Sequence, residues 1–306
     1  MKKIVIGIHG LGNKPPRRLF RTWWKRSLRD GLKKIGTGEI FLPFELVYWA
    51  DILHPIPLDP RQKDTGHPLY LDEKYVKPPR EEPKPVSTLK GKFIESMGRT
   101  LDKIFWDDEF KPNFSFISDL IIRRYFSEFE TYYSKTVPKK NGGDCPVKTL
   151  IRQRLLRVLK RHRNKEIFLI AHSMGSVIAF DVLLSASSEV TVDTLVTIGS
   201  PLGLPMVVHR IYTEHYAGKG PFVPESIRCP DSIRKHWFNF SDIEDKVALD
   251  HRLFDDFQPN IYGVRPTDTY VRNDYAIAGV KNPHKDYGYL RTPKMARVLE
   301  SFLRNP

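Results

Sequence analysis

Ser173 is the residue whose surroundings most clearly suggest chemistry. It lies between a largely apolar run, residues 167–172, and a segment with helical periodicity, residues 174–186, with Ala171 two positions before it and Gly175 two positions after it. A serine in a tight strand-to-helix turn needs small residues at these two positions, because larger side chains would collide with the strand or the helix. The pattern predicts a nucleophile elbow that presents the Ser173 hydroxyl at the end of a strand.

A second glycine-containing turn follows the first apolar run of the chain, residues 4–8. It reads His9, Gly10, Leu11, and a flexible loop of this kind can aim backbone N–H groups at a developing oxyanion. We expect the N–H groups of Leu11 and Met174 to form such an oxyanion hole. The Met174 N–H would also begin a helix, whose dipole favours negative charge at that end.

These motifs resemble those of lipase- and esterase-like α/β hydrolases, in which His-Gly follows an early strand and Ala/Gly-His-Ser-Met-Gly forms the elbow. Residues 197–203, Thr-Ile-Gly-Ser-Pro-Leu-Gly, also look like the strand and loop after the elbow helix in lipases, including relatives of GPI inositol deacylases. The resemblance covers residues 1–49 and about 146–306. It implies an α/β-hydrolase fold and a triad in the chain order serine, acid, histidine.

Two aspartates are candidates for the acid that the resemblance implies. Asp242 and Asp245 both lie in the turn after a predicted strand at residues 236–240. We favour Asp245, because the Asp-x-Val sequence that ends at Val247 is similar to the acid turn of the family. Asp242 is the alternative acid, and whichever aspartate is not the acid would cap the turn or support its neighbour.

His284 is the candidate base, because it lies in a loop before the last predicted helix and its surroundings look like the His-x-x-Tyr loop of the family. His172, beside Ser173, is expected to pack or hydrogen-bond locally. His215 and His251 show no spacing typical of a metal site. We therefore predict no metal and no cofactor.

The expected chemistry follows from the ordinary pKa values of these groups. A serine hydroxyl is a poor nucleophile at neutral pH, so His284 would take its proton while the acid holds the imidazole and stabilises the imidazolium. An acyl-enzyme on Ser173 would then be cleaved by water. A carboxylic ester of a small molecule or a lipid is the favoured substrate, and amide, thioester and peptide substrates stay open because a triad does not select the acyl group.

The elements that must position these residues alternate regularly. We expect strands at residues 4–8, 44–49, 167–172, 195–198 and 236–240, a weaker strand at 275–278, and helices at 19–35, 147–163, 174–186 and 293–303. Strands that alternate with helices indicate parallel βαβ units. The prediction is an α/β fold in one domain, residues 1–306, with a mostly parallel central sheet flanked by helices.

Residues 55–145 form a predicted insertion into this domain. Eight prolines between residues 55 and 85 exclude a continuous helix or central strand there. Apolar residues at helical spacing then predict two helices, one after Ser87 and one at residues 121–133. We expect a helical and irregular cap or lid over the site, although plain packing would give the same helical stripes.

The chain carries a formal net charge of +14, from 50 Lys and Arg against 36 Asp and Glu. Much of this charge lies on the predicted helices 19–35 and 147–163 and their flanks, where solvated outer faces are one explanation and peripheral contact with an anionic membrane surface is another. A non-catalytic protein that kept the fold and binds anionic membrane or nucleic acid is the alternative to an enzyme. Recognisable nucleic-acid modules are missing, so we expect no specific nucleic-acid binding.

The location expected from the sequence is the cytoplasm. No run approaches the roughly 18 uninterrupted apolar residues of a membrane span, and the N-terminal apolar run is too short for a signal peptide. Cys145 and Cys229 suggest neither a disulfide framework nor a zinc knuckle and are expected to be reduced. We predict a soluble protein.

Overall fold

The computed structural model describes residues 2–79, 127, 129–138, 143–216 and 227–304. The predicted helix after Ser87 and most of the one at residues 121–133 lie outside these residues, although residues 129–134 are helical. Residues 55–79 run without a helix or strand apart from an isolated bridge between Asp59 and Tyr70. The expected irregular course is therefore present in this described part of the insertion.

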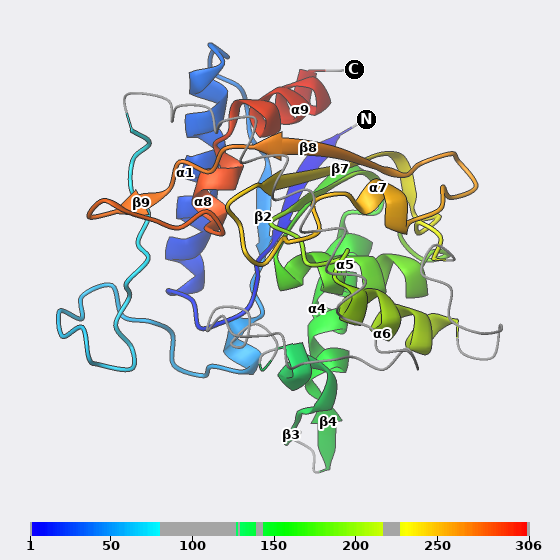
Figure 1. The fold of residues 1–306 in the computed structure, drawn as a ribbon, viewed down its shortest axis with the longest axis horizontal. Helices are drawn as coiled ribbons and strands as arrows, with labels where there is room; N and C mark the ends of the chain where they lie inside the picture. Colours follow the sequence, from blue (N-terminus) through cyan, green and yellow to red (C-terminus); the bar gives the residue numbers. More distant parts are fainter. Residues whose placement is uncertain (1, 80–126, 128, 139–142, 217–226, 305–306) are drawn as a thin grey trace.

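A single sheet of six strands forms the centre of the molecule, and every neighbouring pair in it is parallel (Figure 1). Its spatial order is β2-β1-β5-β6-β7-β8. Because parallel strands need crossover connections, the helices between them must cover the two faces of the sheet. The strands are β1 (Lys3–Ile8), β2 (Phe44–Val47), β5 (Glu166–His172), β6 (Val192–Ile198), β7 (Ile233–Asp242) and β8 (Pro266–Val271).

The helices divide between the two faces of the sheet (Figure 1). One face packs against α4 (Val147–Arg161), α5 (Met174–Ser185) and α6 (Pro205–His215), and the other against α1 (Arg17–Lys34) and α9 (Pro293–Arg304). The short elements are η1 (Ala50–Ile52), α7 (Leu253–Asp256), α8 (Asp286–Leu290) and two hairpins, β3 (Thr136–Pro138) with β4 (Asp144–Pro146) and β9 (Ala276–Ile277) with β10 (Val280–Lys281).

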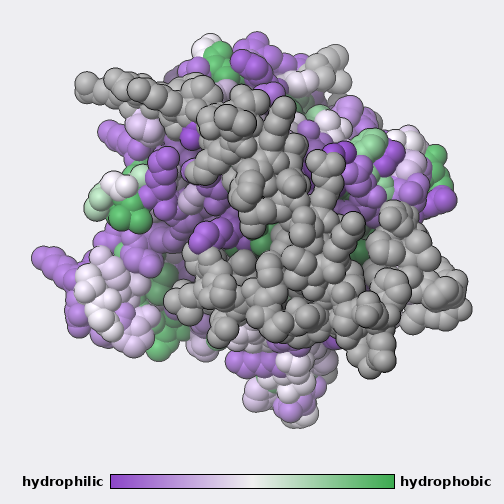
Figure 2. Space-filling view, viewed as in Figure 1, coloured by the Kyte–Doolittle hydropathy of each residue, from purple (hydrophilic) through white to green (hydrophobic). Residues whose placement is uncertain are grey.

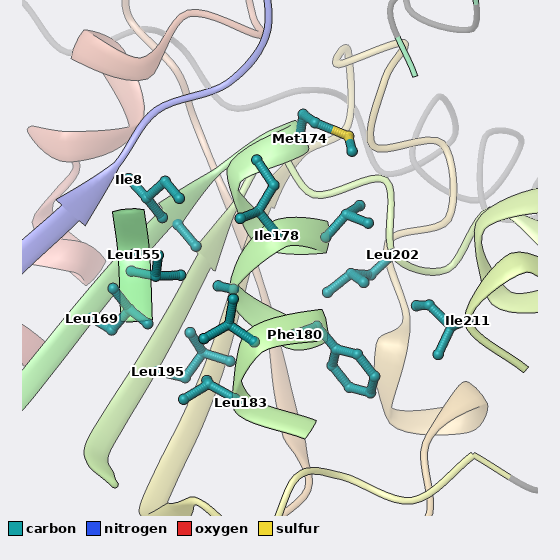
Figure 3. Close-up of a cluster of buried hydrophobic side chains, with 14 of the residues drawn as sticks. Ile8, Leu155, Leu169, Met174, Ile178, Phe180, Leu183, Leu195, Leu202 and Ile211 are labelled. Carbon is teal, nitrogen blue, oxygen red and sulfur yellow. The ribbon is translucent and has the colours of Figure 1, made fainter. Parts of the chain in front are cut away.

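Successive residues of β1 serve opposite faces of the sheet, as the two-residue period of a strand requires. Ile4, Ile6 and Ile8 belong to the core under α4 and α5, whereas Val5 belongs to the core under α1 and α9. At Gly7 a Cβ would lie 2.6 Å from the Trp24 ring, so glycine here lets α1 approach the sheet. Figure 3 shows the α5 side, where Ile178 and Leu183 lie among side chains such as Leu169 and Leu195.

The strand predicted at residues 275–278 is not part of the central sheet. Only Ala276 and Ile277 are extended, and they pair with β10 in a hairpin. The sixth strand is instead β8, whose sequence Pro-Thr-Asp-Thr-Tyr-Val is polar and whose residues are mostly half-buried or exposed, because it forms the edge of the sheet. The sequence prediction also omitted α6 and α8. The expectation of a mostly parallel sheet flanked by helices is confirmed.

Within the described residues, no helix combines the length and the apolar character that crossing a bilayer would require. On the face shown in Figure 2, hydrophilic residues cover most of the described surface, and hydrophobic ones occur in small separate areas.

Candidate active site

Ser173 occupies a sharp turn between the end of β5 and the start of α5. Its backbone has φ 53° and ψ −129°, a combination that a non-glycine residue adopts only when its surroundings hold it there. The Ser173 N–H donates to the Ile198 carbonyl at 3.1 Å, which ties the turn to β6. At Gly175 a Cβ would lie 2.7 Å from the Ile8 carbonyl oxygen, so a larger residue would push α5 away from β1.

His284 lies in the loop before α8 and faces Ser173. Its Nε2 is 2.9 Å from the Ser173 Oγ, and its Nδ1 is 2.9 and 3.0 Å from the two carboxylate oxygens of Asp245. The Asp245 side chain is fully buried and the His284 side chain is about a quarter exposed, at 25%. Three residues from distant parts of the chain thus form one hydrogen-bonded line, in the order that the resemblance implies.

The Asp245 carboxylate is held by more than the imidazole. The Tyr289 hydroxyl donates to it at 2.7 Å and the Val247 N–H at 2.9 Å. Burial by itself would raise the pKa of Asp245, but the charge and hydrogen bond of His284, with the Tyr289 and Val247 hydrogen bonds, lower it to about 2. The group is therefore a carboxylate throughout the neutral pH range.

Asp242, the alternative acid, serves the backbone instead. Its two carboxylate oxygens accept hydrogen bonds from the Glu244 N–H at 2.8 Å and the Asn273 N–H at 2.6 Å. Its own N–H donates to the Tyr289 hydroxyl. Burial raises the pKa of Asp242, whereas at Asp245 the same effect is outweighed by His284 and the hydrogen bonds. The structure therefore brings Asp245 to His284 and uses Asp242 to tie the turn after β7 to the turn after β8.

The loop after β1 is fixed by an exchange of hydrogen bonds between His9 and Trp49. The Trp49 N–H donates to His9 Nε2 at 2.9 Å, the Trp49 indole N–H donates to the His9 carbonyl at 2.8 Å, and the two rings stack. His9 Nδ1 then donates to the Gly10 carbonyl. His9 is fully buried, and burial holds its pKa well below the usual value. The ring is neutral and braces the loop.

Gly10 packs directly against the turn at Ser173. A Cβ there would lie 2.7 Å from the Ser173 Cβ and 3.2 Å from the Ser173 Oγ. Of the two residues predicted to supply oxyanion N–H groups, Leu11 follows this glycine and packs partly buried on the core, and Met174 is the first residue of α5. Leu11 thus follows the glycine that packs on the Ser173 side chain, and Met174 follows Ser173 itself in the chain.

His172 contacts the loop that carries His284. Its Nε2 donates to the His284 carbonyl at 2.8 Å, and the two imidazole rings are 4.9 Å apart. Burial, followed by the nearby charge of His284, holds the pKa of His172 well below its ordinary value. A neutral His172 with its proton on Nε2 fits the carbonyl acceptor. The expected local hydrogen bond is present, and it supports the backbone of the candidate base.

Comparison with known proteins agrees with this architecture. Residues 147–221, which contain Ser173, match the sequence model of the PGAP1-like alpha/beta domain. The chain has the α/β-hydrolase fold. The resemblance to this superfamily is confirmed.

Two further comparisons add little about activity. The RedJ thioesterase from the prodiginine biosynthetic pathway in Streptomyces coelicolor aligns over 99% of this chain and 89% of its own, with 11% identity and a TM-score of 0.31, which is too remote to inform the chemistry. No curated protein matches the sequence.

Two residues of this α/β-hydrolase site were not among the sequence candidates. Tyr289 bridges the carboxylate of Asp245 and the N–H of Asp242. Gly199, with φ 53°, has no room for a Cβ, which would lie 2.9 Å from the Asp245 Oδ2 and 3.2 Å from the His284 Nδ1. Gly199 belongs to the motif at residues 197–203, so a signal for it existed. Tyr289 lies two residues beyond the recognised His-x-x-Tyr loop, and no local pattern distinguishes it.

Among the described residues, one group of possible metal ligands lies away from this site, at Asp181, Glu214 and His215, whose ligand atoms lie within 4.8 Å of one another. Sequence spacing did not reveal the group because α5 and α6 bring it together. The Lys148 ammonium lies 3.3 Å from an Asp181 oxygen, and the Arg152 guanidinium lies 3.4 Å from it. These two cations already balance the acidic charge, which disfavours a metal ion.

Proposed function

We propose that this chain is a serine hydrolase that cleaves a carboxylic ester, with Ser173 as nucleophile, His284 as general base and Asp245 as the acid. The observation that carries the proposal is the His284 ring, which bridges the Ser173 hydroxyl and the Asp245 carboxylate with both of its nitrogens at hydrogen-bond distance. Because Asp245 accepts at Nδ1, it favours the tautomer in which Nε2 is free to take the serine proton.

The reaction would proceed in two balanced steps. In the first, the Ser173 oxygen attacks the ester carbonyl while its proton passes to His284, and the alcohol then leaves with that proton. In the second, His284 takes a proton from water, whose oxygen attacks the acyl-enzyme, and returns it to Ser173 as the acid departs. Asp245 stays ionised, as its pKa of about 2 allows, and stabilises the imidazolium.

We place the oxyanion of each tetrahedral intermediate at the N–H groups of Leu11 and Met174. Gly10 lets the loop after β1 pass against Ser173, and the start of α5 adds the favourable end of a helix dipole. The bracing of this loop by His9 and Trp49 supports the role, because an oxyanion hole acts through donors that are already in position.

The cap over the site is part of the same proposal. Its first residues border the proposed oxyanion loop, since Asn13 donates to the Ile56 carbonyl at 2.9 Å and the Leu58 N–H donates to the Lys14 carbonyl at 3.0 Å. Partly buried apolar residues, including Leu11, Ile52 and Leu53, pack on the core close to this border. They suit the acyl portion of an ester, with a lipid ester as one such substrate.

Hydrolysis of p-nitrophenyl esters with short, medium and long acyl chains, together with labelling by a fluorophosphonate, tests the proposal. Wild type should turn over at least one ester and react with the probe. Ser173→Ala should abolish labelling and lower kcat/KM by about 10⁴-fold or more. Ser301→Ala, on the exposed side of α9, is the matched control and should behave as wild type. A folded wild type without turnover or labelling would instead favour the non-catalytic alternative.

We also propose that α1 contacts an anionic membrane surface. The two basic helices differ in how their charge is balanced. On α4, cations pair with acids of neighbouring elements: Lys148 with Glu214, Arg152 with Asp181, Arg154 with Asp51, Lys160 with Glu189 and Arg161 with Glu45. This pairing leaves less unbalanced positive charge on α4 than its sequence suggests.

On α1, by contrast, Arg17, Arg18, Arg21, Arg29 and Lys33 are exposed, and within the described residues none of them pairs with an acid. Slight burial, and then the charges of Arg29 and Arg21, lower the pKa of Lys25, which reflects the crowding of positive charge along this helix. Such a face attracts anionic lipid head groups through long-range electrostatics.

A cytoplasmic location is the final part of the proposal. Both cysteines are free and buried. Free thiols are usual in proteins of reducing compartments. Fractionation of cells that express the tagged chain would test it.

A further inference from the structure

Part of the first described stretch of the predicted insertion, residues 55–79, contacts the loop that carries His284. Residues 72–76, which we call the strap, run beside the β9 hairpin (Figure 1). The Tyr275 hydroxyl donates to the Lys74 carbonyl at 2.7 Å, and the Arg291 guanidinium donates to the Val76 carbonyl at 2.5 Å. The Tyr75 hydroxyl donates to Asp30 on α1. The strap is therefore anchored on both sides.

Glu73 is the strap residue that reaches the His284 loop. One of its carboxylate oxygens accepts a hydrogen bond from the Lys285 ammonium at 2.6 Å, and the other accepts one from the Asn282 amide. Asn282 in turn accepts a hydrogen bond from the His284 N–H at 3.0 Å. A single carboxylate thus holds residues on both sides of the candidate base.

Lys285 places a positive charge next to His284 in the chain. Its side chain is mostly buried, with 12% exposed, and its nearest acids are Glu73 at 2.6 Å and Asp286 at 3.8 Å. Without Glu73, this ammonium would lose its nearest counter-charge and keep only Asp286, beside an imidazole that must itself become positive during the reaction. Like charges at short range disfavour one another strongly where water is excluded.

We propose that Glu73 is a positioning residue for the general base: it holds the turn at residues 282–285 in place and neutralises Lys285, so that the His284 imidazolium can form. This inference rests on the proposed function of His284. It goes beyond that function because it gives a residue of the insertion, more than two hundred positions away in the chain, a part in tuning the base.

The ionisation of the pair agrees with this role. Burial would raise the pKa of Glu73, yet the charge and hydrogen bond of Lys285 lower it to about 2. Burial would lower the pKa of Lys285, yet the charges of Asp286 and Glu73 raise it. Both groups are ionised at neutral pH.

The titratable and charged groups around His284 come from several elements. They are Ser173 and His172 at the elbow, Asp245 and Tyr289, Lys14 from the loop after β1, and Glu73, Lys285 and Asp286.

The test measures the pKa of His284 by NMR titration of the imidazole, in a Ser173→Ala background so that no turnover is needed. Glu73→Gln should lower this pKa by about 0.5–1 unit, because it removes the nearest counter-charge of Lys285, and Lys285→Met should raise it by a similar amount. The double variant should return close to the starting value. A purely structural role for the pair would not produce opposite shifts that cancel.

Activity is measured in parallel with Ser173 intact. Glu73→Gln should lower kcat on a p-nitrophenyl ester about tenfold with little change in KM, and should move the acidic limb of the pH profile to lower pH. Glu73→Asp should recover part of the loss. Asp72→Asn, which removes the same charge from the exposed neighbouring residue, is the matched control and should change both readouts far less.

Shifts of equal sign in the two single variants, or an Asp72→Asn effect as large as that of Glu73→Gln, would overturn the inference. An unchanged kcat in a folded Glu73→Gln protein would also overturn it. Thermal unfolding identifies any variant that fails to fold, and Glu73→Ala, which also removes the charge, replaces Glu73→Gln in both arms in that case. Lack of ester hydrolysis by wild type would count against the proposed function, while the titration would still report on charge compensation.

Discussion

Asp242 and Asp245 lie three residues apart in the turn after β7, yet their carboxylates contact different groups. Asp245 faces the imidazole and Asp242 faces two backbone N–H groups. Asp245→Asn should lower kcat/KM by about 10³–10⁴-fold, because an amide no longer holds the required tautomer. Asp242→Asn should cost less than about tenfold in kcat/KM but about 1–3 kcal/mol in stability, since an amide cannot accept from both N–H groups.

Ester kinetics and chemical denaturation of the two variants separate these effects. A larger kinetic loss for Asp242→Asn than for Asp245→Asn would reverse the assignment of the acid. Because the two substitutions are chemically identical, each variant serves as the control for the other.

The depressed pKa of Asp245 also predicts a pH dependence of stability. Its pKa is about 2 in the folded protein and near 3.9 in an unfolded chain, so the folded state binds this proton less tightly. The stabilisation is fully present above the unfolded value and is lost as pH falls toward 2. Wild type should lose more free energy of unfolding between about pH 5 and pH 2 than Asp245→Asn does, on the order of 2 kcal/mol more. Parallel loss in both proteins, measured by urea unfolding, would contradict this.

Gly199 shows how closely the backbone packs around Asp245 and His284. Gly199→Ala would place a Cβ 2.9 Å from the Asp245 carboxylate at a residue with φ 53°. We expect a loss of about 1–3 kcal/mol in stability and a fall in kcat of tenfold or more. Gly279→Ala is the control, because φ there is 80° and nothing lies within 4 Å of a Cβ. Equal effects on kcat would show that crowding at Gly199 is unimportant.

At the scale of elements, the braced loop after β1 makes a further prediction. Trp49→Phe would remove the indole N–H that the buried His9 carbonyl accepts. Stability should fall by about 1–3 kcal/mol, and the rate of fluorophosphonate labelling should fall with it if the loop supplies oxyanion donors. Trp23→Phe on α1 provides a matched tryptophan control, since Trp23 is only partly buried. Labelling at the wild-type rate in a destabilised Trp49→Phe protein would separate the loop from catalysis.

Elements with a strong apolar pattern were predictable from the sequence, and those defined by tertiary contacts were not. β1 and β5 are buried on both faces, so their apolar runs were recognised, and the elbow lies between two such elements. β8 is a polar edge strand, and α8 is only five residues long, so neither has a periodic signal. Ser173, Asp245 and His284 lie in recognisable sequence motifs and could therefore be predicted. Tyr289 and Glu73 lie in no such motif, because only the tertiary structure brings them to the site.

At the scale of the whole molecule, the unequal charge balance of α1 and α4 predicts where an anionic surface binds. Wild type should bind vesicles that contain phosphatidylserine and lose binding as salt rises. Replacing Arg18, Arg21 and Arg29 by glutamine should weaken binding roughly a hundredfold, at about 1 kcal/mol per charge. Replacing Arg154, Lys160 and Arg161, which pair with acids, by glutamine changes net charge equally and should have a smaller effect. Equal effects in a sedimentation assay would mean that net charge alone governs binding.

The order of strands in the sheet also has a consequence for synthesis of the chain. β1 lies between β2, which follows it closely, and β5, which begins only at Glu166. At about 5–20 residues per second, a ribosome needs roughly 8 to 30 seconds to make the residues between β1 and β5. During this interval β1 has one open edge and an uncovered apolar face. Nascent chains should therefore engage chaperones at this stage and become resistant to protease only after β5 has emerged.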